Sequence, residues 1–256
     1  MRLLKHYKRI KHKSNTPVQY QRGYTEFYKL KFNLTPDVLI PRPETELLVD
    51  EVIRFLTDHP ERLRRNVGGV EGSCVILDLG TGCGNIAISI AKHLPTSDVG
   101  IRIIASDISK KALDVAKQNA KFHGVSDKII FIKSDLLHYD TLVYHSNLPD
   151  IIVTNLPYIP TQRIPYLDSS VKDFEPLIAL DGGSDGFELY RKLFAQIKEK
   201  KWKPKLIVCE IDYTHRDIAL NEAQKLVVSE VEPYFPKAQI EIKTDLAHKQ
   251  RILIIK

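Results

Sequence analysis

Val75-Ile-Leu-Asp-Leu-Gly-Thr-Gly-Cys-Gly84 runs from a short apolar strand into a glycine-rich turn. Apolar residues at helical spacing follow over 86–94. The three glycines allow positive φ and a close approach of the backbone to a ligand. Asp107 ends the next predicted strand, where a carboxylate can accept hydrogen bonds from a ribose diol. The strand, the helix and the acid in this order predict a nucleotide-binding loop.

Strands and helices alternate along most of the chain. Short apolar runs predict strands at 74–77, 101–105, 129–132, 150–154 and 206–209, and a final antiparallel pair at 239–243 and 251–255. Helical spacing predicts helices at 86–94, 110–122, 187–200 and 216–229. This alternation predicts an α/β fold with a mostly parallel sheet and helices on both faces. Ligands bind such sheets at the carboxyl ends of the strands, where the strand order reverses.

The segment before the loop has a different pattern. Residues 17–42 predict an extended hairpin, because apolar and polar side chains alternate over 26–34 and a turn follows at Thr35-Pro-Asp37. Pro43 predicts the first turn of a helix that continues to Leu56. Residues 58–73 read as a polar connection to the first central strand.

The net charge of +6 comes from one end of the chain. Six basic residues lie within the first 13 positions, namely Arg2, Lys5, Lys8, Arg9, Lys11 and Lys13, and the first acid is Glu26. Without these six, the 38 Lys and Arg fall to 32, equal to the 32 Asp and Glu. The excess therefore belongs to an arm, which can contact RNA, a ribosome or an acidic partner, or remain a solvated tail.

Composition and spacing exclude several classes of protein. The three cysteines, Cys74, Cys83 and Cys209, are too few and too scattered for a disulfide framework, and no Cys or His spacing predicts a metal site. No apolar run is long enough to span a bilayer, and the N-terminus lacks the apolar core of a signal peptide. We therefore expect a cytoplasmic protein without a membrane partner, and a monomer by default.

A second motif, Asp150-Ile-Ile-Val-Thr-Asn-Leu-Pro-Tyr158, follows the fourth predicted strand. Asn155 is expected at the carboxyl end of that strand, facing the cofactor pocket. Its side-chain oxygen, with the backbone carbonyl of Leu156 or Pro157, can accept hydrogen bonds from both N–H bonds of a planar NH2 group. Tyr158 offers a flat wall to such a group, and Pro157 stiffens the turn. The motif predicts a site that acts on a planar NH2 group by positioning and aimed dipoles.

Several blocks of sequence resemble known families. The loop 78–84 resembles the first motif of class I S-adenosylmethionine methyltransferases. Together with Thr35-Pro-Asp-Val-Leu-Ile-Pro-Arg-Pro-Glu-Thr-Glu46, Asn155-Leu-Pro-Tyr158 and Glu175-Pro-Leu-Ile-Ala-Leu-Asp-Gly-Gly-Ser-Asp-Gly186, it resembles the peptide-chain release factor glutamine N5-methyltransferases. Asp245-Leu-Ala and Arg251 are similar to the end of that family. The resemblance covers about residues 17–256.

The resemblance implies a Rossmann-like, seven-stranded, mostly parallel sheet with an antiparallel last strand and an N-terminal hairpin flap. It implies an enzyme of the EC 2.1.1 class that methylates N5 of the glutamine in the Gly-Gly-Gln motif of release factors. The residues that it places at S-adenosylmethionine are Gly80, Thr81, Gly82, Cys83, Gly84, Asp107, Leu136 and Asn155. Those that it places at the glutamine are Asn155, Leu156, Pro157 and Tyr158, of which Asn155, Pro157 and Tyr158 are the catalytic candidates. Arg42 and Glu46 are expected near the pocket, paired so that they fix the flap.

Two departures from the family pattern shape the domain prediction. A basic arm, 1–16, stands where the family usually has a helical substrate-recognition domain, and the flap, 17–42, and the catalytic domain, 43–256, follow it. Leu156 stands where the family has proline, which preserves the backbone carbonyl but predicts a less rigid turn.

Two other functions stay open at this point. Asn-Leu-Pro-Tyr also occurs in RNA adenine dimethyltransferases, and the N6 amine of adenine in RNA or DNA needs the same acceptors. The balanced charge outside the arm and the 175–186 block favour the glutamine reaction. A non-catalytic cofactor-binding module is the other alternative.

Overall fold

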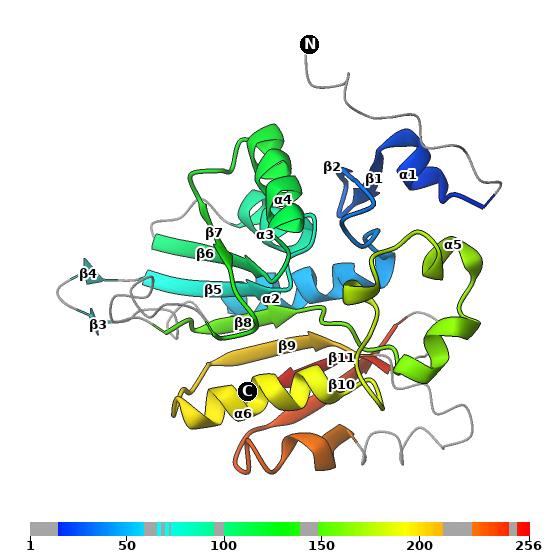
Figure 1. The fold of residues 1–256 in the computed structure, drawn as a ribbon. Helices are drawn as coiled ribbons and strands as arrows, with labels where there is room; N and C mark the ends of the chain where they lie inside the picture. Colours follow the sequence, from blue (N-terminus) through cyan, green and yellow to red (C-terminus); the bar gives the residue numbers. More distant parts are fainter. Residues whose placement is uncertain are drawn as a thin grey trace.

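The computed structural model describes eight stretches of the chain, namely residues 15–58, 66–67, 70–71, 73–94, 100–138, 148–211, 227–245 and 250–256. Their strands build a seven-stranded sheet with helices on both faces, as the sequence predicts (Figure 1). Its strands in chain order are β5 (Ser73–Leu79), β6 (Gly100–Asp107), β7 (Ile129–Lys133), β8 (Ile151–Thr154), β9 (Leu206–Glu210), β10 (Ile240–Thr244) and β11 (Gln250–Ile255).

The order of the strands places the binding site. Across the sheet they lie in the order β10-β11-β9-β8-β5-β6-β7. The five strands β7, β6, β5, β8 and β9 pair in parallel, and β11 pairs antiparallel with both β9 and β10. After β5 the chain builds β6 and β7 on one side and then returns to β8 on the other side. The carboxyl ends of β5 and β8 therefore form the switch point, where α/β sheets bind ligands.

Helices cover the two faces of this sheet. One face is covered by α2 (Glu46–Asp58), α3 (Asn85–His93) and α4 (Lys110–His123), and the other by α6 (Glu188–Glu199) (Figure 1). Successive side chains of a strand point to opposite faces, so Ile76 joins the core under the first three helices while Leu77 joins the core under α6. Burial on both faces explains why the central strands are continuous apolar runs.

The N-terminal flap differs from its prediction. Residues 17–42 were expected to form one extended hairpin, but the segment begins with the helix α1 (Val18–Arg22), which ends at Gly23 with φ of 75°. The hairpin is shorter, with β1 (Tyr24–Phe27) paired to β2 (Leu30–Asn33). Pro17 before the helix and Gly23 after it are ordinary helix-boundary signals, so this helix was predictable.

The remaining short elements lie in the connections. They are the 3₁₀ helices η2 (Pro43–Thr45), η5 (Thr161–Tyr166) and η6 (Leu177–Ala179), the helix α5 (Ser169–Lys172), and the strand pair β3 (Asn66–Val67) and β4 (Val70–Glu71). The predicted helix 216–229 lies outside the described residues except for its last residues, which are helical. The basic residues of the predicted arm also lie outside them. No helix among the described residues is both long and apolar enough to cross a bilayer.

Candidate active site

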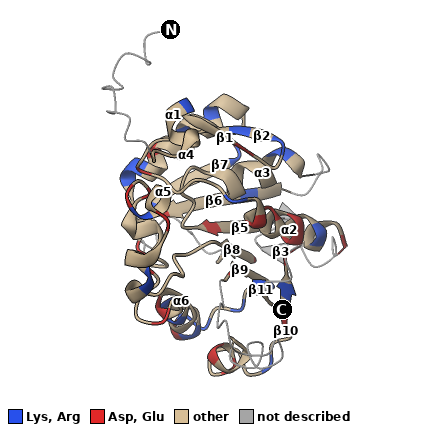
Figure 2. Cartoon of the chain, turned by 90° about the vertical axis from the view of Figure 1, so that its right-hand side faces the viewer, with Lys and Arg blue, Asp and Glu red and all other residues tan. Residues whose placement is uncertain are grey.

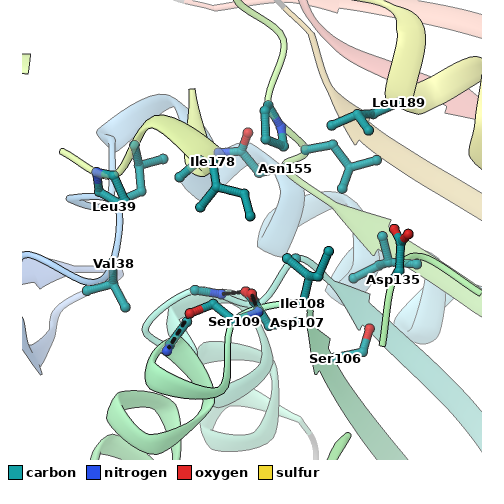
Figure 3. Close-up of a pocket in the computed structure, with 18 of the residues that line it drawn as sticks. Val38, Leu39, Ser106, Asp107, Ile108, Ser109, Asp135, Asn155, Ile178 and Leu189 are labelled. Carbon is teal, nitrogen blue, oxygen red and sulfur yellow. Dashed lines mark hydrogen bonds between the residues drawn. The ribbon is translucent and has the colours of Figure 1, made fainter. Parts of the chain in front are cut away.

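A cavity opens at the carboxyl ends of β5, β6 and β8. It encloses about 860 Å³, part of which is open to solvent. Its walls include Gly80 and Gly82 after β5, Asp107 at the end of β6, and Asn155 after β8. Figure 3 shows Asn155 and Ile178 on one side of this space and Asp107 and Ile108 on the other. The structure thus brings the two sequence motifs to one cavity, which we call the cofactor cavity.

The glycines of the loop keep its backbone open to a ligand. Gly80 and Gly82 have φ of 74° and 55°. These left-handed values favour residues without a Cβ. A Cβ built on Gly82 would meet no protein atom within 4 Å, so no side chain occupies the space beside it. This part of the loop can approach a bound nucleoside closely, as the sequence predicts.

Asp107 joins the two strand ends that form the cavity. Its Oδ2 accepts a hydrogen bond from the N–H of Gly82 at 2.9 Å, and its Oδ1 accepts one from Ser109 at 2.8 Å. A carboxylate offers about four acceptor sites, so both oxygens can still accept from a diol. Burial raises the pKa of Asp107, and the backbone N–H groups oppose that shift. The residue fits the role of a ribose acceptor.

The other loop residues contact the interior of the protein and stabilise the loop. Thr81 is buried and donates its hydroxyl hydrogen to Asp78 at 2.6 Å. Cys83 is buried, and its carbonyl accepts from the Asn119 side chain at 2.9 Å. A Cβ on Gly84 would lie 2.9 Å from Ile88 and 3.1 Å from Ala116, so this glycine permits close packing of α3 and α4. Thr81, Cys83 and Gly84 are not among the residues that line the cavity, and their contact with a cofactor stays a prediction.

Leu136 belongs to the cavity wall, whereas Asp78 does not line the cavity. Leu136 lines the cavity with a left-handed backbone, φ of 49°, and its carbonyl accepts from Ser134 at 2.7 Å. Asp78 is fully buried beneath the loop, and burial raises its pKa to about 7 against the hydrogen bonds from Thr81 and Ala87. Within the described part of the chain its Oδ1 has no partner. A buried acceptor of this kind is usually satisfied by water or a ligand donor.

The turn after β8 separates the cofactor cavity from a second one. Asn155 lines both cavities, Leu156 and Pro157 line the cofactor cavity, and Tyr158 lines the second. The second cavity encloses about 850 Å³, part of it open to solvent, and we call it the acceptor cavity. Its other walls include Arg42, Glu44, Glu210 and Arg251. The predicted substrate-binding turn therefore lies where two hollows meet.

Thr45 and Glu210 were not predicted, yet they hold this turn. The Asn155 Nδ2 lies 3.2 Å from Thr45 Oγ1, and Thr45 Oγ1 lies 2.6 Å from Glu210 Oε2. The hydroxyl of Tyr158 donates to the other oxygen of Glu210 at 3.0 Å. Glu210 ends β9, so the reasoning that identified Asp107 at the end of β6 also applies to it.

Leu156 stands where the family has proline. Its N–H donates to the hydroxyl of buried Tyr190 at 3.2 Å, and that hydroxyl donates to the carbonyl of Glu210. A proline at this position has no N–H to donate. Leu156 thus makes a hydrogen bond that proline cannot make, and the effect of the leucine on the rigidity of the turn stays a prediction.

The 175–186 block supports the turn from outside. Ile159 N–H donates to Leu180 O at 3.0 Å, and Gly182 N–H donates to Ile159 O at 2.9 Å. A Cβ on Gly182 would lie 2.7 Å from the Cα of Tyr158 and 2.8 Å from the carbonyl oxygen of Pro157. Since real Cβ atoms do not come so close, only glycine allows this backbone-to-backbone packing.

The expected pair of Arg42 and Glu46 is wrong. Arg42 pairs with Glu175, whose other oxygen accepts from the N–H of Ile40 at 3.2 Å. Glu46 instead accepts from the N–H of Tyr28 at the tip of the hairpin, at 2.6 Å. Both residues take part in contacts between residues 17–42 and the rest of the fold, but these contacts are separate. The sequence could not reveal the partner of Arg42, because Glu175 is 133 residues away.

The fold and the two cavities define a methyltransferase domain, and a family model described as "Methyltransferase domain" matches residues 71–201. The cofactor of this domain is S-adenosylmethionine. A protein of Bacillus cereus named "Release factor glutamine methyltransferase" is 32% identical over 245 residues, which cover 95% of this chain and 77% of the relative. The chain belongs to the family of release factor glutamine methyltransferases.

Another relative with the same name, from Chlorobaculum tepidum, is 41% identical over 177 residues, or 69% of this chain. That match covers only 56% of the relative, little more than half its length. Among solved structures, the hMettl16 catalytic domain in complex with a MAT2A 3'UTR hairpin has a TM-score of 0.64 at 16% identity, covering 90% of this chain and 76% of that one. At this identity the likeness concerns the fold alone.

Proposed function

We propose that the protein transfers a methyl group from S-adenosylmethionine to the side-chain amide nitrogen, N5, of the glutamine in the Gly-Gly-Gln motif of a peptide chain release factor. The observation that carries the proposal is the place of Asn155, which lines the cofactor cavity and the acceptor cavity at once. A side chain that enters the acceptor cavity meets the cofactor at this residue.

The cofactor is held by the loop and by the ends of β6 and β8 in this proposal. The backbone of Gly80 and Gly82 lies against it, Asp107 accepts from its ribose hydroxyls, and Leu136 packs against it. Thr81, Cys83 and Gly84 contribute by shaping the loop. When bound, S-adenosylmethionine supplies an electrophilic methyl group.

The turn after β8 presents acceptors to the substrate amide. Asn155 Oδ1 accepts one N–H of the glutamine amide. The carbonyl oxygen of Pro157 faces Gly182, so we assign the second acceptor to the carbonyl of Leu156. Tyr158 forms a wall of the acceptor cavity against which the flat amide packs. These contacts would hold the nitrogen in place and draw its lone pair out of conjugation. As the N–C bond formed, the bond between the methyl carbon and the cofactor sulfur would break and leave S-adenosylhomocysteine. One N–H hydrogen would then leave as a proton to the solvent that reaches the acceptor cavity.

The distribution of charged residues outside the site indicates which kind of partner the protein binds. In Figure 2 basic and acidic segments are interspersed over the described part of the chain, which favours a protein substrate over a long RNA groove. We propose that the flap, 17–42, and the domain, 43–256, bind the release factor as a cytoplasmic monomer. We further propose that the basic arm, 1–16, contacts the ribosome, RNA or the factor itself.

One assay separates the candidate functions. The purified protein is incubated with methyl-labelled S-adenosylmethionine and either a release factor, the same factor with its Gly-Gly-Gln glutamine changed to glutamate, or ribosomal RNA. We expect label on the unaltered release factor alone. Peptide mass mapping should then find one added methyl group on the glutamine. Label on RNA would establish adenine methylation instead, while cofactor binding without any transfer would leave a binding module.

A further inference from the structure

A series of hydrogen bonds links Glu210 and Thr45 to the side-chain amide of Asn155, the proposed catalytic residue. Thr45, in η2, and Glu210, at the end of β9, are each 1% exposed. Thr45 Oγ1 lies 2.6 Å from one oxygen of Glu210 and 3.2 Å from Asn155 Nδ2. Tyr158 occupies the other oxygen of Glu210. These hydrogen bonds join residues that are far apart in sequence, since Thr45 is 165 residues from Glu210 and 110 residues from Asn155.

When Glu210 is ionised, counting hydrogens fixes the direction of these hydrogen bonds. An ionised carboxylate only accepts hydrogen bonds, and a hydroxyl has a single hydrogen to donate. Glu210 therefore draws the hydroxyl hydrogen of Thr45 to itself. The Thr45 oxygen then faces Asn155 with a lone pair and can only accept. The NH2 end of the Asn155 amide must lie on this side, so its oxygen faces the other way.

The oxygen of Asn155 is correspondingly available. Among the described residues no group donates to Asn155 Oδ1, although the residue lines both cavities. Without the Thr45 contact the amide could turn over, because its oxygen and nitrogen ends have nearly the same shape. A turned amide would present N–H donors to the substrate.

We propose that Thr45 and Glu210 are positioning residues, which fix the Asn155 carboxamide with its oxygen toward the substrate and so make the site select an NH2 group over a carboxylate. The inference rests on the proposed function, and it extends that function to the discrimination of glutamine from glutamate. A carboxylate in place of the amide meets acceptors only and is repelled.

Which group donates and which accepts in these hydrogen bonds depends on the charge of Glu210. A protonated Glu210 can donate to Thr45, which then donates to Asn155 and reverses the amide. Burial raises the pKa of Glu210, while the hydrogen bonds from Thr45 and Tyr158 lower it. Of the charged groups around it, Arg251 of β11 lowers this pKa and Glu44 of η2 raises it. Two further titratable residues lie near Glu210, namely Tyr190 of α6 and Arg42.

The first test compares kinetics of the full chain on a release factor. Thr45→Val removes the hydroxyl at constant shape and is expected to lower kcat about tenfold, the rate equivalent of one lost hydrogen bond. KM for S-adenosylmethionine should stay near that of the wild type, whereas the melting temperature should fall, because a buried oxygen of Glu210 loses its donor. Thr45→Ser restores the hydroxyl and should recover most of kcat. The matched control is Thr57→Val, at an exposed threonine of α2, the helix that follows η2.

The second readout is the pH profile. The wild type should lose kcat on the acid side at a pH above the ordinary range of glutamate, whereas Glu210→Gln should show a low kcat without that acid limb. Wild-type kcat in Thr45→Val, or no recovery in Thr45→Ser, would overturn the positioning role while leaving the proposed function intact.

A third readout does not depend on activity. In ¹⁵N-labelled protein, the side-chain NH2 resonance of Asn155 is identified by its absence in Asn155→Ala. It should shift with pH in the wild type and stay constant in Glu210→Gln. A resonance that does not respond to pH in either protein overturns the inference. A wild type that fails to methylate glutamine but shows the shift refutes the proposed function alone.

Discussion

The N–H of Gly82 donates a hydrogen bond of 2.9 Å to the carboxylate of Asp107, and this contact ties the loop after β5 to the end of β6. The same carboxylate accepts from Ser109 at the start of α4. Asp107 therefore holds the glycine loop in shape and remains able to accept from a ribose. Because one side chain does both, its loss should affect the cofactor more than a surface contact would.

Asp107→Ala is expected to weaken binding of S-adenosylhomocysteine about 10- to 100-fold, since hydrogen bonds to a charged group contribute about 1.5–3 kcal/mol. Isothermal titration calorimetry measures the affinity. Asp114→Ala, which removes an exposed acid from the neighbouring helix α4, should bind like the wild type. Equal affinity for the Asp107 and Asp114 variants would remove Asp107 from the cofactor site.

Asn155→Ala is expected to lower kcat by about 10²–10³, because loss of one preorganised transition-state contact costs roughly 2.7–4 kcal/mol. The affinity for S-adenosylhomocysteine should change little, since Asn155 is one wall among many in the cofactor cavity. Turnover and calorimetry on the same preparation separate the two effects. Unchanged turnover would show that the acceptor lies elsewhere.

The sequence could predict those parts of the site that follow a strand directly. Gly80, Asp107 and Asn155 each follow or end an apolar run, and parallel strands bring such positions to one edge of the sheet. Glu210 has the same signal, an acid at the end of a buried strand, and could have been found. Thr45 could not, because nothing local distinguishes a buried threonine that contacts Asn155 from an exposed one.

Long-range pairings were beyond sequence reasoning for the same reason. The expected contact of Arg42 with Glu46 joined two charges that are close in sequence, whereas the folded chain pairs Arg42 with Glu175. The role of the 175–186 block was also invisible, because it depends on the approach of Gly182 to the Tyr158 backbone. Family resemblance identified the block, but packing explains it.

Gly182→Ala should destabilise the turn that carries Tyr158. The new Cβ would lie 2.7–2.8 Å from backbone atoms of Pro157 and Tyr158, so the two loops must separate. Overpacking of this kind costs about 1–3 kcal/mol, and we expect lower kcat and a lower free energy of unfolding in urea. Ser184→Ala changes an exposed residue of the same loop and serves as the control. Two indistinguishable variants would show that the loop adapts freely.

Deletion of residues 1–13 removes six positive charges. If this arm attracts a macromolecular substrate, kcat/KM for the release factor should fall at low salt and approach the full-length value at high salt, because salt screens the attraction. Methylation of a short Gly-Gly-Gln peptide should change less. Identical kinetics at every salt concentration would identify the arm as a passive tail.

Tyr190→Phe tests the hydrogen bonds behind the turn. The Tyr190 hydroxyl accepts from Leu156 N–H at 3.2 Å and donates to the Glu210 carbonyl, and the side chain is 0% exposed. Phenylalanine keeps the ring but leaves a buried donor and a buried acceptor unpaired, at about 1–3 kcal/mol for each unsatisfied group. We expect a lower midpoint of urea unfolding with an unchanged m-value. Tyr166→Phe, at a tyrosine that is 88% exposed, should leave the midpoint unchanged. A Tyr190 variant as stable as this control would mean that Leu156 N–H has another acceptor, and that the turn does not depend on α6.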